Sequence, residues 1–309
     1  MKVVFFGTPN YVIPVLKVLH TRFNKPPEKN LIGIVTQPPK IVGRQKFKEF
    51  SAVDNYAHKR KINIIYDPND LPEADLGVLA AYGEIIPQKV INRFRYGILN
   101  VHPSLLPEFR GASPTQASIT LDKKTTGVSI IKMDELLDHG PIVSSFKDEL
   151  HPDDTNESLR QRLFERASDF LTGMIDSYVS GKIKLKPQDH NNAIYTRQIN
   201  KEDGFISPEL FKLALLGKKT DLTFNNFFIK NVEFVANAKN IERLSRAFYP
   251  WPGIWTLVKT NKNVNEPKRL KIIKCRLVEN KLMPELVQLE GKTEVNWKQF
   301  QEGYPEYEF

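Results

Sequence analysis

Several polar side chains gather in the stretch LNVHPSLLPEFRGASP, residues 99–114. Asn100 and His102 lie two residues apart at the end of the apolar run GILNVH. If that run is a strand, both side chains point to the same face at its carboxyl end, where open α/β sheets bind their ligands. An amide donates hydrogen bonds to an oxyanion, and an imidazole moves protons near neutral pH. The pair is therefore equipped for acyl transfer, although an Asn and a His that only stabilise a turn would show the same spacing.

An acidic residue follows in the segment KMDELLDHGPIV. Asp138 lies in a predicted loop after a further apolar run, so its carboxylate is a candidate to orient the His102 imidazole. An Asp close before a Gly is also a common turn feature, and the spacing alone leaves both interpretations open. Ser104 does not indicate a serine hydrolase, because no G-x-S-x-G elbow surrounds it.

The elements that must position these residues alternate between apolar and amphipathic segments. The apolar runs are too continuous for a sheet with one wet face, so they predict a covered, mostly parallel sheet. These runs are residues 2–7, 31–37, 62–67, 76–82 and 97–102, followed by 125–134 and 140–150. Amphipathic segments predict helices at 11–19, 51–60 and 87–94, and a long helix with Asp154 and Glu157 as its capping pair closes the first domain.

The remainder of the chain predicts a second, smaller domain. Residues 186–204 are polar without a strong period, which is typical of a linker. Beyond them, 220–238 and 269–291 alternate like strands, and 240–255 predicts a helix ended by two prolines. The fold class is therefore α/β, with a Rossmann-like sheet that has helices on both faces, followed by a smaller β-rich domain at 205–309.

Composition narrows the class of protein and its setting. The 309 residues carry a formal net charge of +9, which favours a polyanionic partner such as nucleic acid. The single cysteine, Cys275, excludes an internal disulfide and a cysteine-based zinc cluster, and its alternating surroundings predict a half-buried strand thiol. The run MKVVFFGTPN has only four apolar residues before Gly7, too few for a signal peptide or a membrane span. We expect a soluble, cytoplasmic, monomeric protein without a metal.

The longer stretch LNVHPSLLPEFRGASPTQASI resembles the signature of the formyltransferase family that uses 10-formyltetrahydrofolate. Further segments resemble the family in order along nearly the whole chain, among them FFGTP, AAYGEIIP and TGVSIIKMD. PQDHNNAIYTRQINKEDG and RAFYPWPGIW resemble the longer two-domain members, which formylate the initiator methionyl-tRNA for translation initiation. The resemblance implies a formyltransferase catalytic domain at 1–185, a linker at 186–204 and a β-rich, OB-like barrel domain at 205–309 that binds tRNA.

The resemblance also assigns roles to individual positions. It implies that Asn100, His102 and Asp138 are catalytic, and that the formyl group passes directly from N10 of the folate to an amine. The residues that it implies for the folate cleft are Tyr82, Gly83, Glu84, Ile85, Ser104, Leu105, Leu106 and Pro107. The stretch 37–50 has the composition of a flexible basic loop, which could also be merely solvated. The resemblance implies tRNA contacts there from Lys40, Arg44, Lys46 and Lys48.

Three features depart from the family pattern. The family commonly has Gly before the catalytic Asp and Thr-Gly-Asp after it, whereas Leu137 precedes Asp138 here and His-Gly-Pro follows. We expect His139 to be an exposed loop residue, with a second proton carrier as the alternative. Pro103 stiffens the turn after His102, and the segment 205–240 is longer than usual and has no assigned function.

Two other functions share parts of this pattern. A formyltransferase acting on an amino-sugar nucleotide would carry the same catalytic residues, but the basic loop and basic C-terminal part disfavour it. A non-catalytic RNA-binding protein on this fold would not need an intact Asn100, His102 and Asp138. The C-terminal cations include Lys274 and Arg276, which alternate with apolar residues and predict a strand with one cationic face.

Overall fold

The computed structural model describes residues 1–42, 46–224, 227–260 and 266–309. The chain forms two compact units, and each combines several segments of the sequence. The first unit comprises Met1–Arg110, Thr125–Glu149 and Arg160–Ala193, and the second comprises Gly111–Lys124, Leu150–Leu159 and Ile194–Phe309. The domain bounds given above stay a prediction. Within the described ranges, no helix is both long and apolar enough to cross a membrane.

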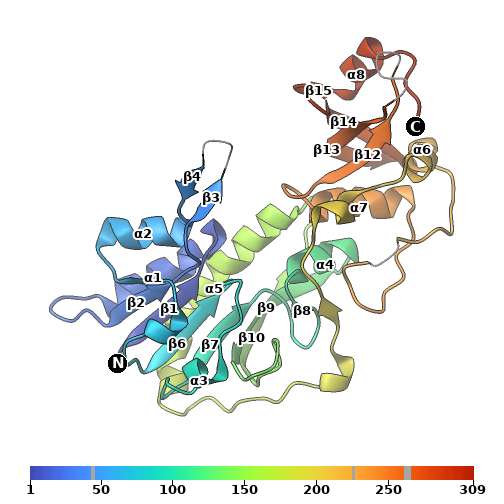
Figure 1. Ribbon diagram of the computed structural model, residues 1–309. Coiled ribbons are helices and arrows are strands. Elements are labelled where there is room, and N and C mark those ends of the chain that lie inside the picture. Colours follow the sequence, from blue (N-terminus) through green and yellow to red (C-terminus); the bar gives the residue numbers. More distant parts are fainter. Residues whose placement is uncertain (43–45, 225–226, 261–265) are drawn as a thin grey trace. The chain divides into compact units, whose positions relative to one another are not determined.

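A seven-stranded sheet forms the centre of the first unit (Figure 1). Its strand order is β10-β9-β7-β6-β1-β2-β5, in which β9 pairs antiparallel with both β10 and β7, and all the pairs from β7 to β5 are parallel. The bounds are β1 Val3–Gly7, β2 Leu31–Val35, β5 Ile64–Ile65, β6 Leu76–Ala80, β7 Ile98–His102, β9 Thr125–Lys132 and β10 Ile142–Glu149. The predicted mostly parallel sheet is confirmed.

Helices cover both faces of this sheet, as its sequence predicts. Every residue of β1, β6 and β7 is buried, which accounts for their continuous apolar character. Val4 and Phe6 belong to a core cluster with residues of α3 (Gln88–Ile91), while the alternate residues of β1 are buried on the opposite face. The other helices are α1 Ile13–Phe23, α2 Ala52–Arg60 and α5 Asn156–Val179.

The parallel pairing of β6 and β7 creates the edge that matters for function. Leu79 lies opposite Asn100 in this pair, so both strands end at the same edge of the sheet. On its other side β7 pairs antiparallel with β9, where His102 lies opposite Ser129. The chain that leaves β6 at 81 and the chain that leaves β7 at 103 therefore emerge side by side.

The second unit contains an antiparallel sheet of order β12-β13-β14-β15, which confirms a small β-rich unit. Its strands are β12 Ile254–Val258, β13 Lys268–Val278, β14 Lys281–Leu289 and β15 Glu294–Asn296. The helices are α4 Pro114–Thr120, α6 Pro208–Leu216, α7 Ala238–Ala247 and α8 Trp297–Gly303. Helix α7 packs against α4, β13 and β14. Two short strands, β8 Arg110–Gly111 and β11 Tyr195–Thr196, pair with each other.

The strands predicted at 220–238 do not form in the described part of that segment. The structure has only an isolated bridge between Thr223 and Val235 and another that joins Ile229 to Thr196. The alternating aromatic residues make ring contacts instead, and Phe227 stacks on Phe234 with centroids 4.6 Å apart. The alternating aromatic residues in this segment therefore pack against one another and do not form a pair of strands.

The basic stretch at 37–50 is not a simple flexible loop. It contains an antiparallel hairpin of β3 (Lys40–Val42) and β4 (Phe47–Glu49), visible in Figure 1. Lys40 lies directly opposite Glu49, and opposite charges in that position stabilise a strand pair. The prediction from composition was wrong because it considered the charges and not the β-forming residues between them.

The start of α5 also differs from the sequence-based expectation. Thr155 Oγ1 accepts a hydrogen bond from the Ser158 backbone N–H at 3.2 Å, and Ser158 Oγ accepts one from the Thr155 N–H at 3.0 Å. This reciprocal pair has the geometry of a capping box, with Ser in place of the usual acidic residue. Asp154 instead accepts hydrogen bonds from Ser158 Oγ and from the His151 N–H. The predicted pair of Asp154 and Glu157 is therefore displaced by one residue.

This cap gives a direct test of the fold. We expect Thr155→Ala to lower the free energy of unfolding by about 1 kcal/mol, because it removes the acceptor for an otherwise unpaired helix N–H. Glu157→Ala is the matched control and should cost less than half as much, since Glu157 is exposed and contributes only a charge near the helix N-terminus. Urea unfolding of both variants measures the difference. An equal loss of stability in the two variants would favour Asp154 and Glu157 as the capping pair.

Candidate active site

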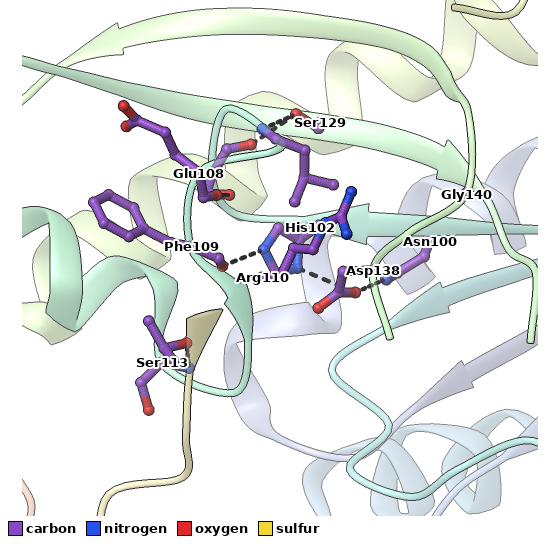
Figure 2. A network of polar contacts seen from close by, with 12 residues as sticks. Asn100, His102, Glu108, Phe109, Arg110, Ser113, Ser129, Asp138 and Gly140 are labelled. Carbon is purple, nitrogen blue, oxygen red and sulfur yellow. Dashed lines mark hydrogen bonds and ion pairs between the residues drawn. The ribbon is translucent and has the colours of Figure 1, made fainter. Parts of the chain in front are cut away.

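Asn100, His102 and Asp138 come together at the carboxyl end of β7 (Figure 2). Asn100 and His102 project from the same face of the strand and are 8% and 4% exposed. Asp138 comes from the loop between β9 and β10. Asn100 Nδ2 donates a hydrogen bond to Asp138 Oδ1 at 3.0 Å, and His102 Nδ1 lies 3.5 Å from the same oxygen. One carboxylate oxygen therefore faces both of the other side chains.

The second ring nitrogen of His102 has a backbone partner. Nε2 lies 3.0 Å from the carbonyl oxygen of Phe109, which can only accept, so Nε2 donates this hydrogen bond. The bond fixes the orientation of the ring and directs Nδ1 toward Asp138. A proton that His102 acquires at Nδ1 would face the Asp138 carboxylate, an arrangement suited to a base that takes a proton from an attacking amine.

The backbone at Asp138 has an unusual conformation. Its φ of 48° lies in the left-handed region, which is uncommon for a residue other than Gly. Gly140 follows two residues later, and a Cβ atom there would lie 1.9 Å from the carbonyl oxygen of Lys132. The turn is thus pressed against the end of β9 and tolerates no side chain at 140.

A buried pair that the sequence analysis missed supports this turn. Arg110 is 1% exposed, and its Nε and Nη2 donate to Gln188 Oε1 at 3.1 and 2.7 Å. Gln188 Nε2 in turn donates to the carbonyl oxygens of Asp138 and Gly140 at 2.9 and 2.8 Å. Arg110 stands within the opening motif, but Gln188 lies in the aperiodic stretch taken for a linker, where no pattern singles it out.

His139 is half-buried, in contrast to the expected exposed loop residue. Its ring stacks on that of His190 with centroids 3.9 Å apart, and its Nδ1 lies 2.7 Å from Asp134 Oδ2. His190 Nδ1 lies 2.8 Å from Arg110 Nη2 and accepts that hydrogen bond, because a guanidinium has only donors. Burial, followed by the charges of His139 and Arg110, lowers the pKa of His190 below its ordinary value.

The residues predicted for the folate cleft follow β6 and β7, at the same sheet edge as the catalytic candidates. Tyr82 is buried, and its hydroxyl donates to Glu84 Oε2 at 3.2 Å. Burial and the adjacent Glu84 carboxylate raise the pKa of Tyr82, so its hydroxyl stays a donor. Gly83 has a φ of 86°, and Ile85 is 92% exposed. An apolar side chain so exposed beside a buried tyrosine suits a ligand surface.

The second cleft segment is held firmly to β9. Ser104 Oγ donates to the carbonyl oxygen of Glu108 at 2.6 Å, which fits a loop-stabilising hydroxyl. Ser129 Oγ donates to the carbonyl oxygen of Ser104 at 2.8 Å and accepts from the N–H of Leu106 at 2.9 Å. Leu105 remains half-buried, whereas Leu106 is buried, and Pro107 follows it. The SLLP segment is therefore a fixed wall.

The predicted tRNA-binding lysines are exposed. Lys40, Lys46 and Lys48 lie on the β3–β4 hairpin or at its turn, and Arg44 lies outside the described residues. The hairpin also exposes Phe47, which is 64% accessible. No group of three or more His, Cys, Asp or Glu side chains within the described ranges could hold a metal ion.

In the second unit, β13 has the alternation that its sequence predicts. Lys274 and Arg276 are exposed and lie 3.0 and 3.1 Å from Glu285 oxygens, while Cys275 between them is buried. Burial raises the pKa of Cys275 to about 12, which keeps the thiol protonated and unreactive. The cationic face therefore includes one carboxylate between its two cations.

Comparisons with known proteins point to one family. Residues 1–175 match a family model described as formyl transferase, and residues 230–285 match one described as formyl transferase, C-terminal domain. The methionyl-tRNA formyltransferase of Sulfurihydrogenibium is 31% identical over 305 residues, which cover 94% of this chain and 86% of that protein. The enzyme of the same name from Chloroflexus aggregans is 30% identical over 83% of this chain and 76% of its own length.

Solved structures show the same architecture. The methionyl-tRNA formyltransferase from Clostridium thermocellum has a TM-score of 0.54 at 18% identity, over 94% of this chain and 98% of that chain. An N-formyltransferase from Helicobacter canadensis, solved with folinic acid and dTDP-3-aminofucose, has a TM-score of 0.61 at 16% identity, over 90% and 88%. At identities this low the likeness shows the fold alone.

The lowered pKa of His190 predicts a pH-dependent stability. The unfolded chain takes up a proton at a higher pH than the folded chain does, so the free energy of unfolding should fall as the pH drops below about 6.5. Asp134 and Asp189 oppose the shift but do not reverse it. We expect His190→Asn, which keeps an acceptor for Arg110, to reduce this fall. Urea unfolding at pH 8, 7, 6 and 5 measures it, with pH 8 as the internal reference.

The expected reduction is partial, because burial and Arg60 also lower the pKa of His20. A His190→Asn variant whose stability falls with pH as steeply as that of the parent would contradict the prediction.

Proposed function

This chain belongs to the formyl transferase family, and on that basis we infer that it transfers a formyl group to the free amino group of methionyl-tRNA. The family uses formyl-tetrahydrofolate donors, and we propose 10-formyltetrahydrofolate and the initiator tRNA as the two substrates. The observation that carries the proposal is the contact of Asn100 and His102 with one oxygen of Asp138. Because the acceptor serves translation initiation, we propose that the enzyme acts in the cytoplasm.

The catalytic residues are proposed to stabilise negative charge on the formyl oxygen. When the methionyl amine attacks the formyl carbon, that oxygen becomes an oxyanion. One N–H of the Asn100 amide donates to Asp138, which leaves the second N–H to donate to the oxyanion. A well-placed donor of this kind lowers an acyl-transfer barrier by roughly 3 to 4 kcal/mol.

His102 is proposed to carry the proton. It takes a proton from the attacking ammonium at Nδ1, and the Asp138 carboxylate balances the charge that the ring gains. The proton then passes to N10 of the folate as the bond between N10 and the formyl carbon breaks. The new amide and tetrahydrofolate are the products, and the protein forms no covalent intermediate.

The donor is proposed to lie against two segments. Residues 82–85 follow β6 and residues 104–107 follow β7, and the pairing of these strands puts both segments at the edge where His102 ends β7. Exposed Ile85 and half-buried Leu105 offer apolar surface for the flat pterin ring. The hydrogen bonds that Ser129 makes to the SLLP segment keep that surface fixed.

The tRNA is proposed to contact the basic stretch 37–50 through Lys40, Arg44, Lys46 and Lys48. Exposed lysines on a hairpin neutralise phosphates, and exposed Phe47 offers a ring on which a base can stack. We also propose that the C-terminal region 205–309 binds tRNA through cations such as Lys274 and Arg276, which are exposed on β13.

A direct assay tests the function. The protein is incubated with 10-formyltetrahydrofolate and either methionyl-tRNA or an amino-sugar nucleotide, and the formylated product is identified by mass spectrometry. We expect formyl-methionyl-tRNA. Formylation of the sugar alone would overturn the proposal in favour of the sugar enzyme, and no formylation of either would favour a non-catalytic RNA-binding protein.

Substitution of the catalytic candidates should abolish turnover without unfolding the chain. We expect His102→Ala and Asn100→Ala each to lower kcat at least a hundredfold, because each removes a group that acts on the transition state. Steady-state kinetics with methionyl-tRNA measures the loss, and circular dichroism and tRNA binding serve as controls. Turnover within threefold of the parent in either variant would contradict the mechanism.

The basic hairpin should control tRNA affinity and not folate affinity. We expect Arg44→Ala to weaken methionyl-tRNA formylation strongly, and Lys46→Ala with Lys48→Ala to reduce the salt dependence of tRNA binding by about two phosphate contacts. Binding is measured across a potassium chloride series, with folate affinity measured in parallel.

A matched control is the double substitution Lys182→Ala and Lys184→Ala, since both lysines are exposed elsewhere in the first unit. This control should leave the salt dependence as in the parent. An equal reduction in both double variants would show that general charge, and not the hairpin, binds the tRNA.

A further inference from the structure

We propose that Gln188 is a positioning residue that holds the Asp138 carboxylate in its catalytic place through the backbone of the turn. The inference rests on the proposed function, because it assigns Gln188 a part in that same reaction. Gln188 is 6% exposed, and its side-chain amide bonds both Asp138 and Gly140, the residues on either side of His139 (Figure 2 labels Asp138 and Gly140). These hydrogen bonds, and those to Arg110, reach the main chain of the turn and a guanidinium, not the side chain of a catalytic candidate.

Chemistry fixes the orientation of the Gln188 amide. Arg110 has only N–H donors, so the atom that it contacts through Nε and Nη2 must be the amide oxygen. The NH2 group then faces the two backbone carbonyl oxygens, at 2.9 and 2.8 Å, and uses both of its N–H bonds on them. In the reversed orientation the NH2 group would face the N–H donors of Arg110, and the amide oxygen would face the two carbonyl oxygens, so none of these hydrogen bonds could form. Arg110 therefore sets the direction in which Gln188 donates.

The main chain places Gln188 beside the turn. Lys186 pairs with Ile142 of β10 in an antiparallel bridge, with hydrogen bonds of 2.8 and 2.9 Å in the two directions. This bridge fastens the chain two residues before Gln188 to the strand that leaves the Asp138 turn. Gln188 thus acts from a fixed backbone, as positioning requires.

The turn needs such support because its conformation is unfavourable. A left-handed residue other than Gly is held there only by its surroundings, and Asp138 has a φ of 48°. Its carboxylate oxygen lies 3.0 Å from Asn100 Nδ2 and 3.5 Å from His102 Nδ1, so a shift of a few tenths of an ångström decides whether the second contact is a hydrogen bond. The two bonds from Gln188 restrain that shift.

The test uses Gln188→Met, which keeps the side-chain length and removes both hydrogen bonds to the turn. We expect kcat for methionyl-tRNA formylation to fall at least tenfold, while the KM values for folate and tRNA stay within twofold of the parent, because the side chain bonds only Arg110 and two main-chain carbonyls. An unchanged kcat in a folded variant would overturn the inference. Gln161→Met is the matched control on α5, where the amide donates to Glu165 of the same helix, and it should behave as the parent.

A second variant tests the same inference if Gln188→Met does not fold. Gln188→Glu keeps an oxygen for Arg110 and gains an ion pair with it, but its other oxygen cannot donate to the carbonyls of Asp138 and Gly140. We expect this variant to stay folded and to lose kcat at least tenfold as well. Parent-like turnover in Gln188→Glu would show that the two donated bonds are not needed.

A double-mutant cycle separates positioning from a purely structural role. If Gln188 acts through the Asp138 carboxylate, Gln188→Met should lower the single-turnover rate less than twofold once Asp138→Asn is present. A tenfold loss in both backgrounds would instead indicate a general structural defect and overturn the inference. The parent is measured first: an inactive parent contradicts the proposed function, whereas an active parent with additive variants contradicts the role of Gln188 alone.

Discussion

The site depends on one constraint, which is that a buried carboxylate from a loop must meet an amide and an imidazole from a strand. Burial of a carboxylate is costly unless hydrogen bonds replace its water. The Asn100 amide supplies one such bond, and His102 Nδ1 lies 3.5 Å from the same oxygen, where it faces the carboxylate when it carries a proton. Phe109 fixes that ring from its other side. The loop around Asp138 must then be held in place as firmly as a strand. Its own backbone does not favour this, because Asp138 has an unfavourable positive φ.

The sheet topology explains why these residues come together at this place. Parallel strands β6 and β7 end at one edge, so their connections leave side by side. The antiparallel β9 runs back along β7 and ends opposite Leu99, and the loop that follows β9 brings Asp138 to the side chains of Asn100 and His102. Each connection is held by polar contacts: Thr8 donates to the carbonyl of Tyr82, Ser129 bonds the SLLP segment, and Gln188 bonds the Asp138 turn. These supporting hydrogen bonds fix the positions of the site residues, because loops without such support hold side chains less precisely than strands or helices do.

Sequence patterns predicted the features that depend on residues close together in the chain. They missed the features that depend on contacts between residues far apart in the sequence. Continuous apolar runs predicted the buried strands, and a two-residue spacing placed Asn100 and His102 on one face. By contrast, the ring contact between Phe227 and Phe234 depends on packing that alternation cannot separate from a strand. Gln188 lies in an aperiodic segment, and its partner Arg110 is distant in the sequence, so no local pattern relates them. The half-buried state of His139 likewise depends on His190, which only folding brings near.

The departure from the family pattern at His139 has a physical counterpart in that second histidine. A His after the catalytic Asp places a large aromatic ring where the resemblance leads one to expect a small hydroxyl side chain, and His190 covers it with a parallel ring 3.9 Å away. Arg110 requires an acceptor at His190 Nδ1, so the second ring must be neutral for this contact to form. Asp134 Oδ2 lies 2.7 Å from Nδ1 of the first ring and bonds it. The large ring at position 139 is thus accommodated by one connected set of contacts. The set begins at Asp134, passes through the two histidines, Arg110 and Gln188, and ends at the carbonyl oxygen of Asp138.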